Sequence, residues 1–214
     1  HSCHRANDDA GECLVGPPPA RRNGEESFPD LRTKSVTRSS TEAARPNEED
    51  LFGWAFWYAR HRMPVFPLAP RSKVPLAGSK GVHDATTDPE KIDRWWKQEA
   101  EGNIAGAVPE GYILLDVDGS EGRASIAGQH LPHTVTATTP REDVGHHYWY
   151  RLPEGVTATN RAILPGVDLK AFGGKAFGGY AVLPPSVHPD TGRRYEWSSG
   201  CAPWEVQLAE APEW

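Results

Sequence analysis

The chain has 214 residues, 37% of them hydrophobic, and a formal net charge of −6. No apolar run approaches the roughly 20 residues that a membrane-spanning helix needs, and the N-terminal segment lacks the basic-then-apolar order of a secretory signal peptide. We therefore exclude a membrane protein and expect a cytoplasmic one. Residues 48–214 carry 16 basic and 22 acidic side chains. The overall charge does not favour a nucleic-acid partner, which would need a local basic patch or metal ions that neutralise the acids.

Residues 1–46 contain a single aromatic residue, Phe28, and show no apolar periodicity. Such a segment cannot bury enough apolar area to offset the entropy lost on ordering it, so we predict a disordered tail over 1–46 and one domain over 47–214. The chain does not begin with Met, and it stops at Trp214 without an obvious finish. We expect the native protein to continue, with a helicase domain in the same chain or in a partner as the candidate.

Two helical segments and a series of strands are predicted within the domain. Asn47 and the acids that follow it predict a helix start, because a capping side chain and negative charge are favourable at a helix N-terminus. Thr87 or Asp88 predicts a second cap, with Pro89 at the first helical position. The predicted strands, separated by Gly and Pro turn signals, cover residues 64–68, 111–116, 134–138, 146–151, 179–183 and 193–197.

This order of elements decides between fold classes. Helices first and then mostly strands indicate a mixed α/β (α+β) domain, with N-terminal helices packed on mixed or antiparallel strands, rather than a doubly wound parallel sheet. One irregularity is the segment KAFGG at 170–174, which is repeated at once at 175–179. A five-residue copy is far shorter than the roughly 20 to 50 residues of a repeat architecture, so we interpret it as a duplication that lengthens a loop.

The strongest chemical signal is the pair Asp116 and Asp118 at the end of the apolar segment 111–115. Residues two apart on a strand point to the same face, so both carboxylates can reach one point, and hard oxygen ligands of this kind suit Mg²⁺. The alternative is a pair of acids that enter a solvated turn, because Asp followed by Gly119 is a common turn former. The motif is short, and by itself it leaves both interpretations open.

A histidine and a third acid lie in two further strand segments. On its predicted strand, His147 faces away from His146, and it is either an ordinary partly buried histidine or a donor to a phosphate oxygen. Asp168 also follows apolar residues, and Lys170, two positions later, shares its face. Alone, Asp168 and Lys170 would be an ordinary ion pair at the end of a strand.

Several short motifs also occur in a characteristic order. They are VFPL (65–68), Lys73 before Pro75, GVHDATTD (81–88), Ile92 with Trp95 and Trp96, Asn103 with Ile104, LDVD (115–118), GHHYWY (145–150), PGVD (165–168) and GGYAVLPPS (178–186). No single motif is specific, but their succession over about residues 50–200 resembles the bifunctional primase/polymerase (prim-pol) domains of the archaeo-eukaryotic primase superfamily. Those domains occur on plasmids, phages and integrated elements.

The resemblance implies a DNA primase and/or DNA polymerase, that is, a metal-dependent, template-directed nucleotidyl transferase. Its implied fold is an archaeo-eukaryotic primase-like α/β catalytic core with an RRM-like sheet. Asp116, Asp118 and Asp168 match the positions that bind two divalent ions, Mg²⁺ or Mn²⁺. The implied partners are a single-stranded DNA template and NTP or dNTP.

The nucleotide contacts implied by the resemblance are a histidine and two lysines. His147 matches the family position before the aromatic pair, where the side chain contacts phosphates of the incoming nucleotide. Lys170 matches a basic residue that faces the triphosphate, and Lys73 is a weaker match to a nucleotide contact. A basic strip for the template is not obvious, and the best candidates are Arg193-Arg194 and, for base stacking, Trp95-Trp96.

Two departures from the family pattern leave an alternative open. Val144 stands where the histidine motif usually opens with glycine, and the duplication lies between Asp168 and Gly179. If Asp168 and Lys170 keep their pairing, the extra residues form a loop, whereas a slipped register would impair activity. The alternatives are therefore a catalytically inactive nucleic-acid- or nucleotide-binding module and, from the phosphatase-like segment ILLDVDGSEG (113–122), a haloacid-dehalogenase-type phosphatase that lacks its downstream acid pair.

Overall fold

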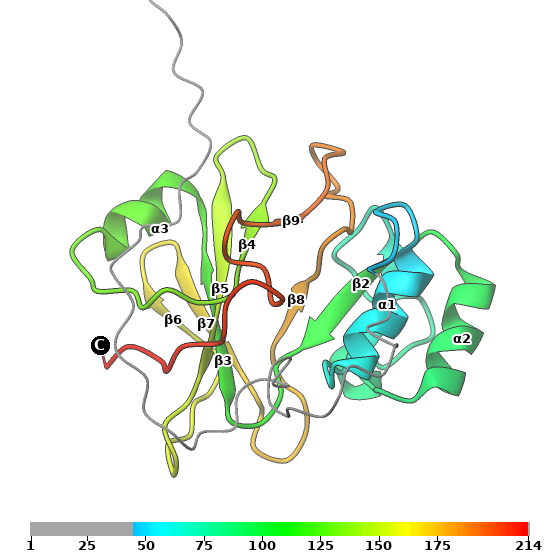
Figure 1. Cartoon of the computed structure of the whole chain (residues 1–214), viewed down its shortest axis with the longest axis horizontal. Helices are drawn as coiled ribbons and strands as arrows, with labels where there is room; N and C mark the ends of the chain where they lie inside the picture. The colour runs from blue at the N-terminus through cyan, green and yellow to red at the C-terminus, as the bar shows by residue number, and fades with distance from the viewer. Residues whose placement is uncertain (1–44, 214) are drawn as a thin grey trace, which may run out of the picture.

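The computed structural model describes residues 45–213, which fold into two antiparallel sheets and three α-helices (Figure 1). This architecture confirms the predicted mixed α/β class. Except for residues 45 and 46, the segment predicted to be disordered lies outside the described residues. No helix within 45–213 is long and apolar enough to cross a lipid bilayer.

The smaller sheet has three strands and carries the two N-terminal helices. In sheet order its strands are β1 (Val65–Pro70), β2 (Gly102–Ala107) and β8 (Tyr180–Val182), and the helices are α1 (Leu51–Arg60) and α2 (Pro89–Gln98). A 3-10 helix, η1 (Gly81–Asp84), follows β1. Both helices contact β1, and α1 also contacts β2, so they cover this sheet as predicted.

The larger sheet has six strands and is antiparallel throughout. In sheet order they are β6 (Arg161–Leu164), β7 (Val167–Ala171), β3 (Tyr112–Val117), β5 (Gly145–Arg151), β4 (Thr136–Thr139) and β9 (Glu196–Trp197). Helix α3 (Gly119–Ile126) follows β3 directly. Strand β3, which carries the predicted acids, therefore lies inside the sheet between β7 and β5.

Apolar clusters pack against both faces of the larger sheet. On one face Leu114 of β3 and Trp149 of β5 are register partners and belong to the apolar cluster that includes α1. On the other face Leu115 packs in a cluster with Ile126 of α3. Because successive side chains of a strand point to opposite faces, Asp116 lies on the Leu114 face.

Aspartates cap the first two helices. Asp88 caps α2, with Pro89 at the first helical position, as predicted. Helix α1 starts later than the predicted position at Asn47. Residues 47–50 form a turn in which the amide of Asp50 donates to the carbonyl of Asn47 (2.9 Å), and the Asp50 side chain then caps the helix.

Two elements that position the site were not predicted. Strand β2 is buried at every position, so it lacks the polar–apolar alternation that marks a half-exposed strand. Helix α3 contains Gly119 and Gly122, which are weak helix formers, and the sequence at its start is equally compatible with a solvated turn. Both elements form because of tertiary packing, although the local sequence pattern does not favour a strand in β2 or a helix in α3.

The duplicated segment forms a hairpin beyond the end of β7. Phe172 of the first copy pairs with Phe177 of the second, and their ring centroids lie 5.6 Å apart. Asp168 and Lys170 remain in register with β3. The extra residues therefore form a loop, and the register next to the acids does not slip.

Candidate active site

A row of register partners crosses the larger sheet where the site is predicted. Asp168 of β7, Asp116 of β3 and His147 of β5 lie directly opposite one another in neighbouring strands. Directly opposed residues of antiparallel strands share one face and lie side by side. Ala162 of β6 and Ala137 of β4 continue the row with small side chains.

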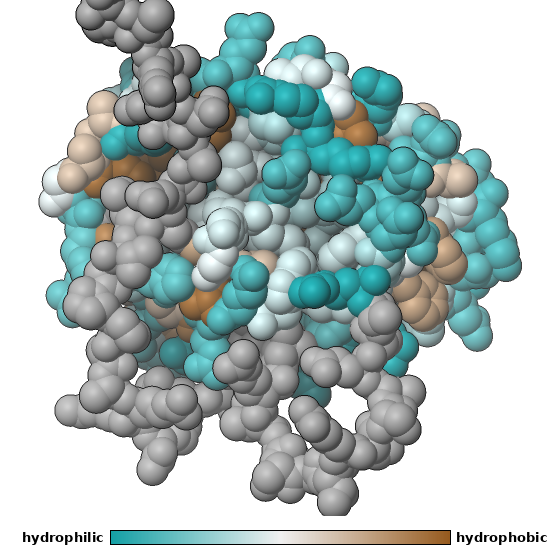
Figure 2. Space-filling model, turned by 45° about the horizontal axis from the view of Figure 1, so that its top comes forward, coloured by the Kyte–Doolittle hydropathy of each residue, from teal (hydrophilic) through white to brown (hydrophobic). Residues whose placement is uncertain are grey.

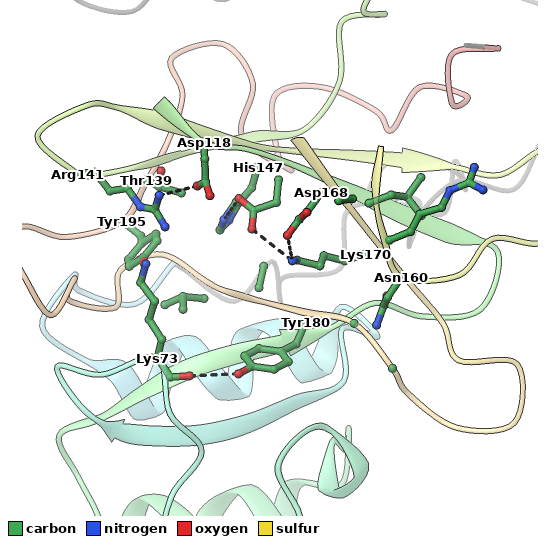
Figure 3. A pocket seen from close by; sticks show the side chains of 18 residues that line it. Lys73, Asp118, Thr139, Arg141, His147, Asn160, Asp168, Lys170, Tyr180 and Tyr195 are labelled. Carbon is green, nitrogen blue, oxygen red and sulfur yellow. Dashed lines mark hydrogen bonds and ion pairs between the residues drawn. The ribbon is translucent and has the colours of Figure 1, made fainter. Parts of the chain in front are cut away.

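Apart from Ala137, this row lies in one wall of a cleft of about 530 Å³ between the two sheets (Figure 3). The smaller-sheet side contributes Lys73, from the loop after β1, and Tyr180 of β8, whose hydroxyl donates to the carbonyl of Lys73 (3.2 Å). All six predicted site residues line the cleft: Lys73, Asp116, Asp118, His147, Asp168 and Lys170. Lining residues that the sequence did not single out include Thr139, Arg141, Asn160, Tyr180 and Tyr195.

Asp116 is the most enclosed of the three acids, with a side chain that is 23% exposed. Its Oδ1 lies 3.4 Å from Nε2 of His147, and its Oδ2 lies 3.8 Å from Nζ of Lys170. Burial by itself would raise the pKa of this carboxyl, but the hydrogen bond and charge of His147, with the charges of Lys170 and Arg141, hold the pKa of Asp116 below its ordinary value. The group is therefore a carboxylate at neutral pH.

Asp118 stands at the N-cap position of α3 without capping it. The cap comes from Asp143 in the loop between β4 and β5, whose Oδ2 accepts from the amide of Ser120 (2.6 Å) and from its hydroxyl (2.9 Å). Arg123 of α3 pairs with the other oxygen of Asp143 (3.0 Å). Because a distant aspartate caps the helix, the carboxylate of Asp118 is free to face the cleft.

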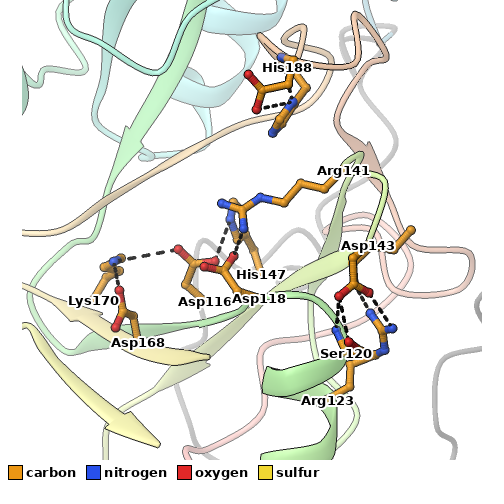
Figure 4. A network of polar contacts seen from close by, with 12 residues as sticks. Asp116, Asp118, Ser120, Arg123, Arg141, Asp143, His147, Asp168, Lys170 and His188 are labelled. Carbon is orange, nitrogen blue, oxygen red and sulfur yellow. Dashed lines mark hydrogen bonds and ion pairs between the residues drawn. The ribbon is translucent and has the colours of Figure 1, made fainter. Parts of the chain in front are cut away.

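The acids are paired with cations of the chain itself (Figure 4). Arg141 Nη1 lies 2.8 Å from Asp118 Oδ1. Lys170 Nζ lies 2.8 Å from Asp168 Oδ2, in addition to its contact with Asp116. In this wall of the cleft, each of the three carboxylates therefore has a lysine or arginine side chain beside it.

Lys73 adds positive charge from the opposite side of the cleft. In Figure 3 its side chain extends toward Arg141 and Tyr195. Burial is the main reason that the pKa of Lys73 is lowered, and the charge of Arg141 lowers it further. The negative charges of Asp116 and Asp118 partly offset this by raising the pKa. Two cations thus meet at this end of the cleft.

His147 is held by its surroundings rather than exposed to solvent. Its side chain is 7% exposed, and its ring stacks on that of Tyr195, with centroids 6.2 Å apart and planes at 25°. Burial raises the pKa of the Tyr195 hydroxyl, so this group stays neutral. The stacked ring fixes the orientation of His147 toward Asp116.

The four residues suggested for template binding make other contacts in the described part of the chain, and Trp95 packs partly buried with the ammonium of Lys91 4.7 Å from its ring centroid. Trp96 is 3% exposed and donates from Nε1 to the carbonyl of Gly102 (3.2 Å), so the prediction that it stacks on bases is wrong. Arg193 donates to the carbonyls of Pro140 and Arg141, and Arg194 donates to that of Pro185. These contacts tie loops together.

The loops after β4 and before β9 lie at the top of Figure 1, and Figure 2 shows the molecule with this top turned toward the viewer. Most of the surface visible in this view is hydrophilic, and the apolar patches are small and separate. Polar and charged partners therefore suit this face better than an apolar one.

The three acids suit divalent ions by their chemistry. Carboxylate oxygens are the hard ligands that Mg²⁺ and Mn²⁺ prefer, and Asp116, Asp118 and Asp168 all line one cleft. Over residues 45–213, however, no three His, Cys, Asp or Glu side chains are grouped so that they could hold a metal ion. Lys170 and Arg141 contact the acids instead.

Comparison with known proteins gives one family. The profile of the bifunctional DNA primase/polymerase N-terminal domain (Prim-Pol) matches residues 55–214. No curated protein matches the chain significantly. The matched range begins within α1 and contains every residue that lines the cleft.

Proposed function

The chain belongs to the family of bifunctional DNA primase/polymerase N-terminal domains, and from this premise we propose that its cleft carries template-directed nucleotidyl transfer with two divalent ions. The observation that supports this most directly is the row Asp168, Asp116 and His147 on one wall of the cleft, with Asp118 beside it. It combines three hard ligands with a hydrogen-bond donor. The family supports an enzyme of the primase/polymerase type, and the use of metal ions is our proposal.

Asp116, Asp118 and Asp168 would hold the two ions, Mg²⁺ or Mn²⁺. When bound, such ions lower the pKa of the attacking 3′-hydroxyl and stabilise the pyrophosphate that leaves. The 3′-oxygen forms a bond to the α-phosphorus of the nucleotide, the bond from that phosphorus to the bridging oxygen breaks, and the hydroxyl proton passes to water. The low pKa of Asp116 keeps it ionised for this role.

The cations and the histidine would bind and orient the triphosphate. His147 would donate a hydrogen bond to a phosphate oxygen, and its stacking on Tyr195 restricts the ring to few orientations. Lys170 and Lys73 approach from the larger and the smaller sheet, so they can neutralise phosphate charge from both sides. Desolvation in a cleft strengthens these interactions relative to bulk water.

The proposed partners are single-stranded DNA as the template and NTP or dNTP as the substrate. A plasmid or phage replication context, a cytoplasmic location and a helicase in the same or a partner chain belong to the same proposal. Since the domain as a whole is acidic, DNA binding would depend on local positive groups and would weaken steeply with salt.

The second candidate is an inactive nucleic-acid- or nucleotide-binding module. Its supporting observation is that Arg141 and Lys170 contact the acids directly, at 2.8 Å from Asp118 and Asp168. If those pairs are permanent, no ion can enter. The phosphatase alternative is dropped, because the chain belongs to a different family.

The test is incorporation of labelled NTP and dNTP on single-stranded DNA, with and without a primer, in Mg²⁺ or Mn²⁺. The double variant Asp116→Ala/Asp118→Ala is the catalytic control. We expect metal-dependent product that the double variant does not form, and the primer requirement separates primase from polymerase activity. A folded wild-type chain that forms no product under any of these conditions would favour the binding module.

A further inference from the structure

Arg141 was not singled out by the sequence, yet it is the cation closest to Asp118. Its Nη1 lies 2.8 Å from Asp118 Oδ1, and the two side chains are 38% and 44% exposed. The pair lies at the cleft wall rather than in the core, so water and ions can reach it. An ion pair with this exposure is weak and can be broken by a competing charge.

The backbone at Arg141 is held by hydrogen bonds from a distant segment. The carbonyl of Pro140 accepts from the hydroxyl of Thr191 (2.6 Å) and from Nη2 of Arg193 (3.2 Å), and the carbonyl of Arg141 accepts from the same Nη2 (2.5 Å). These bonds tie the start of the β4–β5 loop to the segment before β9. Movement of the guanidinium therefore requires only side-chain rotation, with no rearrangement of the loop.

A divalent ion and the guanidinium compete for the same carboxylate. A divalent ion on Asp118 would stand beside the positive charge of Arg141, and like charges at this distance repel. A guanidinium binds phosphate with the same planar, two-pronged geometry with which it binds carboxylate. Lys73 extends toward Arg141 from the smaller sheet, so a polyanion in this part of the cleft would meet two cations.

We propose that Arg141 is a displaceable counter-ion: it neutralises Asp118 in the empty cleft and transfers to the phosphates of the incoming nucleotide when metal ions bind the acids. This inference rests on the proposed function, because it assumes that the cleft binds metal and nucleotide. It adds a nucleotide-binding residue to the site.

The inference predicts two effects of opposite sign. Arg141→Gln removes the competitor at Asp118, so Mn²⁺ alone binds more tightly, by about 2- to 5-fold if the ion pair has the usual strength of an exposed pair. The same change removes a charge-assisted hydrogen bond to phosphate, so dATP in the presence of Mn²⁺ binds about 10-fold or more weakly. A purely structural role for Arg141 would weaken both.

The experiment titrates the full chain with Mn²⁺, followed by electron paramagnetic resonance of the free ion, and then with dATP at saturating Mn²⁺ without DNA, followed by calorimetry. Arg94→Gln is the matched control, because Arg94 lies on α2 with a side chain that is 62% exposed and pairs only with Glu90 at 4.0 Å among the described contacts. Arg141→Lys keeps the charge but loses the planar fork. We expect it to bind Mn²⁺ as the wild type does and to recover dATP binding only in part.

The outcomes separate the two proposals. Tighter Mn²⁺ and weaker dATP binding in Arg141→Gln, with Arg94→Gln unchanged, would support the displaceable counter-ion. Weaker binding of both ligands, or no change in either, would overturn it while leaving the proposed function standing. A wild-type chain that binds neither Mn²⁺ nor dATP would overturn the proposed function and this inference together.

Discussion

The imidazole Nε2 of His147 lies 3.4 Å from Oδ1 of Asp116, its direct partner in the pairing of β3 with β5. The sheet register places these groups side by side, and the stacked ring of Tyr195 keeps the imidazole turned toward the carboxylate. The same register places Asp168 on the opposite side of Asp116. The site is thus built across three strands rather than along one segment.

Replacement of His147 by Ala is expected to slow nucleotide incorporation by roughly 10²-fold, the usual loss when a positioned donor to a reacting group is removed. Steady-state incorporation under the conditions that give product with the wild type measures this effect. His83→Ala is the control, because His83 is exposed on η1 and does not line the cleft. Full activity of His147→Ala would show that the histidine has only a packing role.

Asp143→Ala is expected to lower both the thermal unfolding midpoint and the activity. The carboxylate of Asp143 accepts two hydrogen bonds from Ser120 at the start of α3, and without it Asp118 becomes the nearest side chain that can cap the helix. A capping Asp118 would turn away from the cleft. Asp143→Asn keeps an acceptor and should retain most of both properties. Equal activity losses in the two variants would contradict this explanation.

Nucleotide binding should weaken at a lower alkaline pH than an ordinary lysine contact would give, because burial and the charge of Arg141 lower the pKa of Lys73. A lysine with a lowered pKa loses its charge earlier on the alkaline side, and with it the attraction for phosphate. The measurement is the dissociation constant of dATP between pH 7 and pH 10. Lys73→Gln should bind more weakly at pH 7 and show a flatter profile. Parallel profiles for the two proteins would exclude Lys73 as the titrating contact.

Gly122→Ala is expected to destabilise the chain by about 1–3 kcal/mol, the usual cost of forcing an extra carbon into a packed site. A Cβ at this position would lie 2.3 Å from the carbonyl oxygen of Gly166, in the turn before β7. Gly128→Ala is the matched control, since a Cβ there meets no atom within 4 Å. Urea unfolding of the two variants measures the difference, and equal midpoints would show that α3 is not packed this closely on the turn.

Deletion of residues 175–179, the second KAFGG copy, is expected to leave the fold intact and activity within about threefold of the wild type, which corresponds to less than 1 kcal/mol. The amide of Gly179 donates to the carbonyl of Ala171 (2.9 Å), so the two ends of the hairpin are already adjacent. The pairing of β7 with β3 fixes the register of Asp168 independently of the loop. Incorporation assays and thermal unfolding test the deletion. Loss of activity from a folded variant would assign the hairpin a role in substrate binding.

Local sequence patterns predicted many of the elements, and together with the family resemblance they singled out the three aspartates that line the cleft. The Asp88-Pro89 start of α2 follows from capping chemistry and from the fixed φ angle of proline, and both are local properties. The apolar segment that ends in Asp116 predicted β3 to within a residue or two. Where the local signal was weak, as in the fully buried β2 and the glycine-containing α3, the prediction failed because burial rather than periodicity determines these elements.

The sequence by itself therefore singled out the acids, the histidine and the two lysines that line the cleft, since the chemistry of a side chain does not depend on the fold. The tertiary structure decided which groups meet. Asp168 faces Asp116 because β7 pairs with β3, and Arg141 reaches Asp118 because the β4–β5 loop is tied to the segment before β9. Trp96 is buried for the same kind of reason, since its partners come from other segments. Strand register and loop path depend on contacts between segments distant in the chain, and no local pattern encodes them.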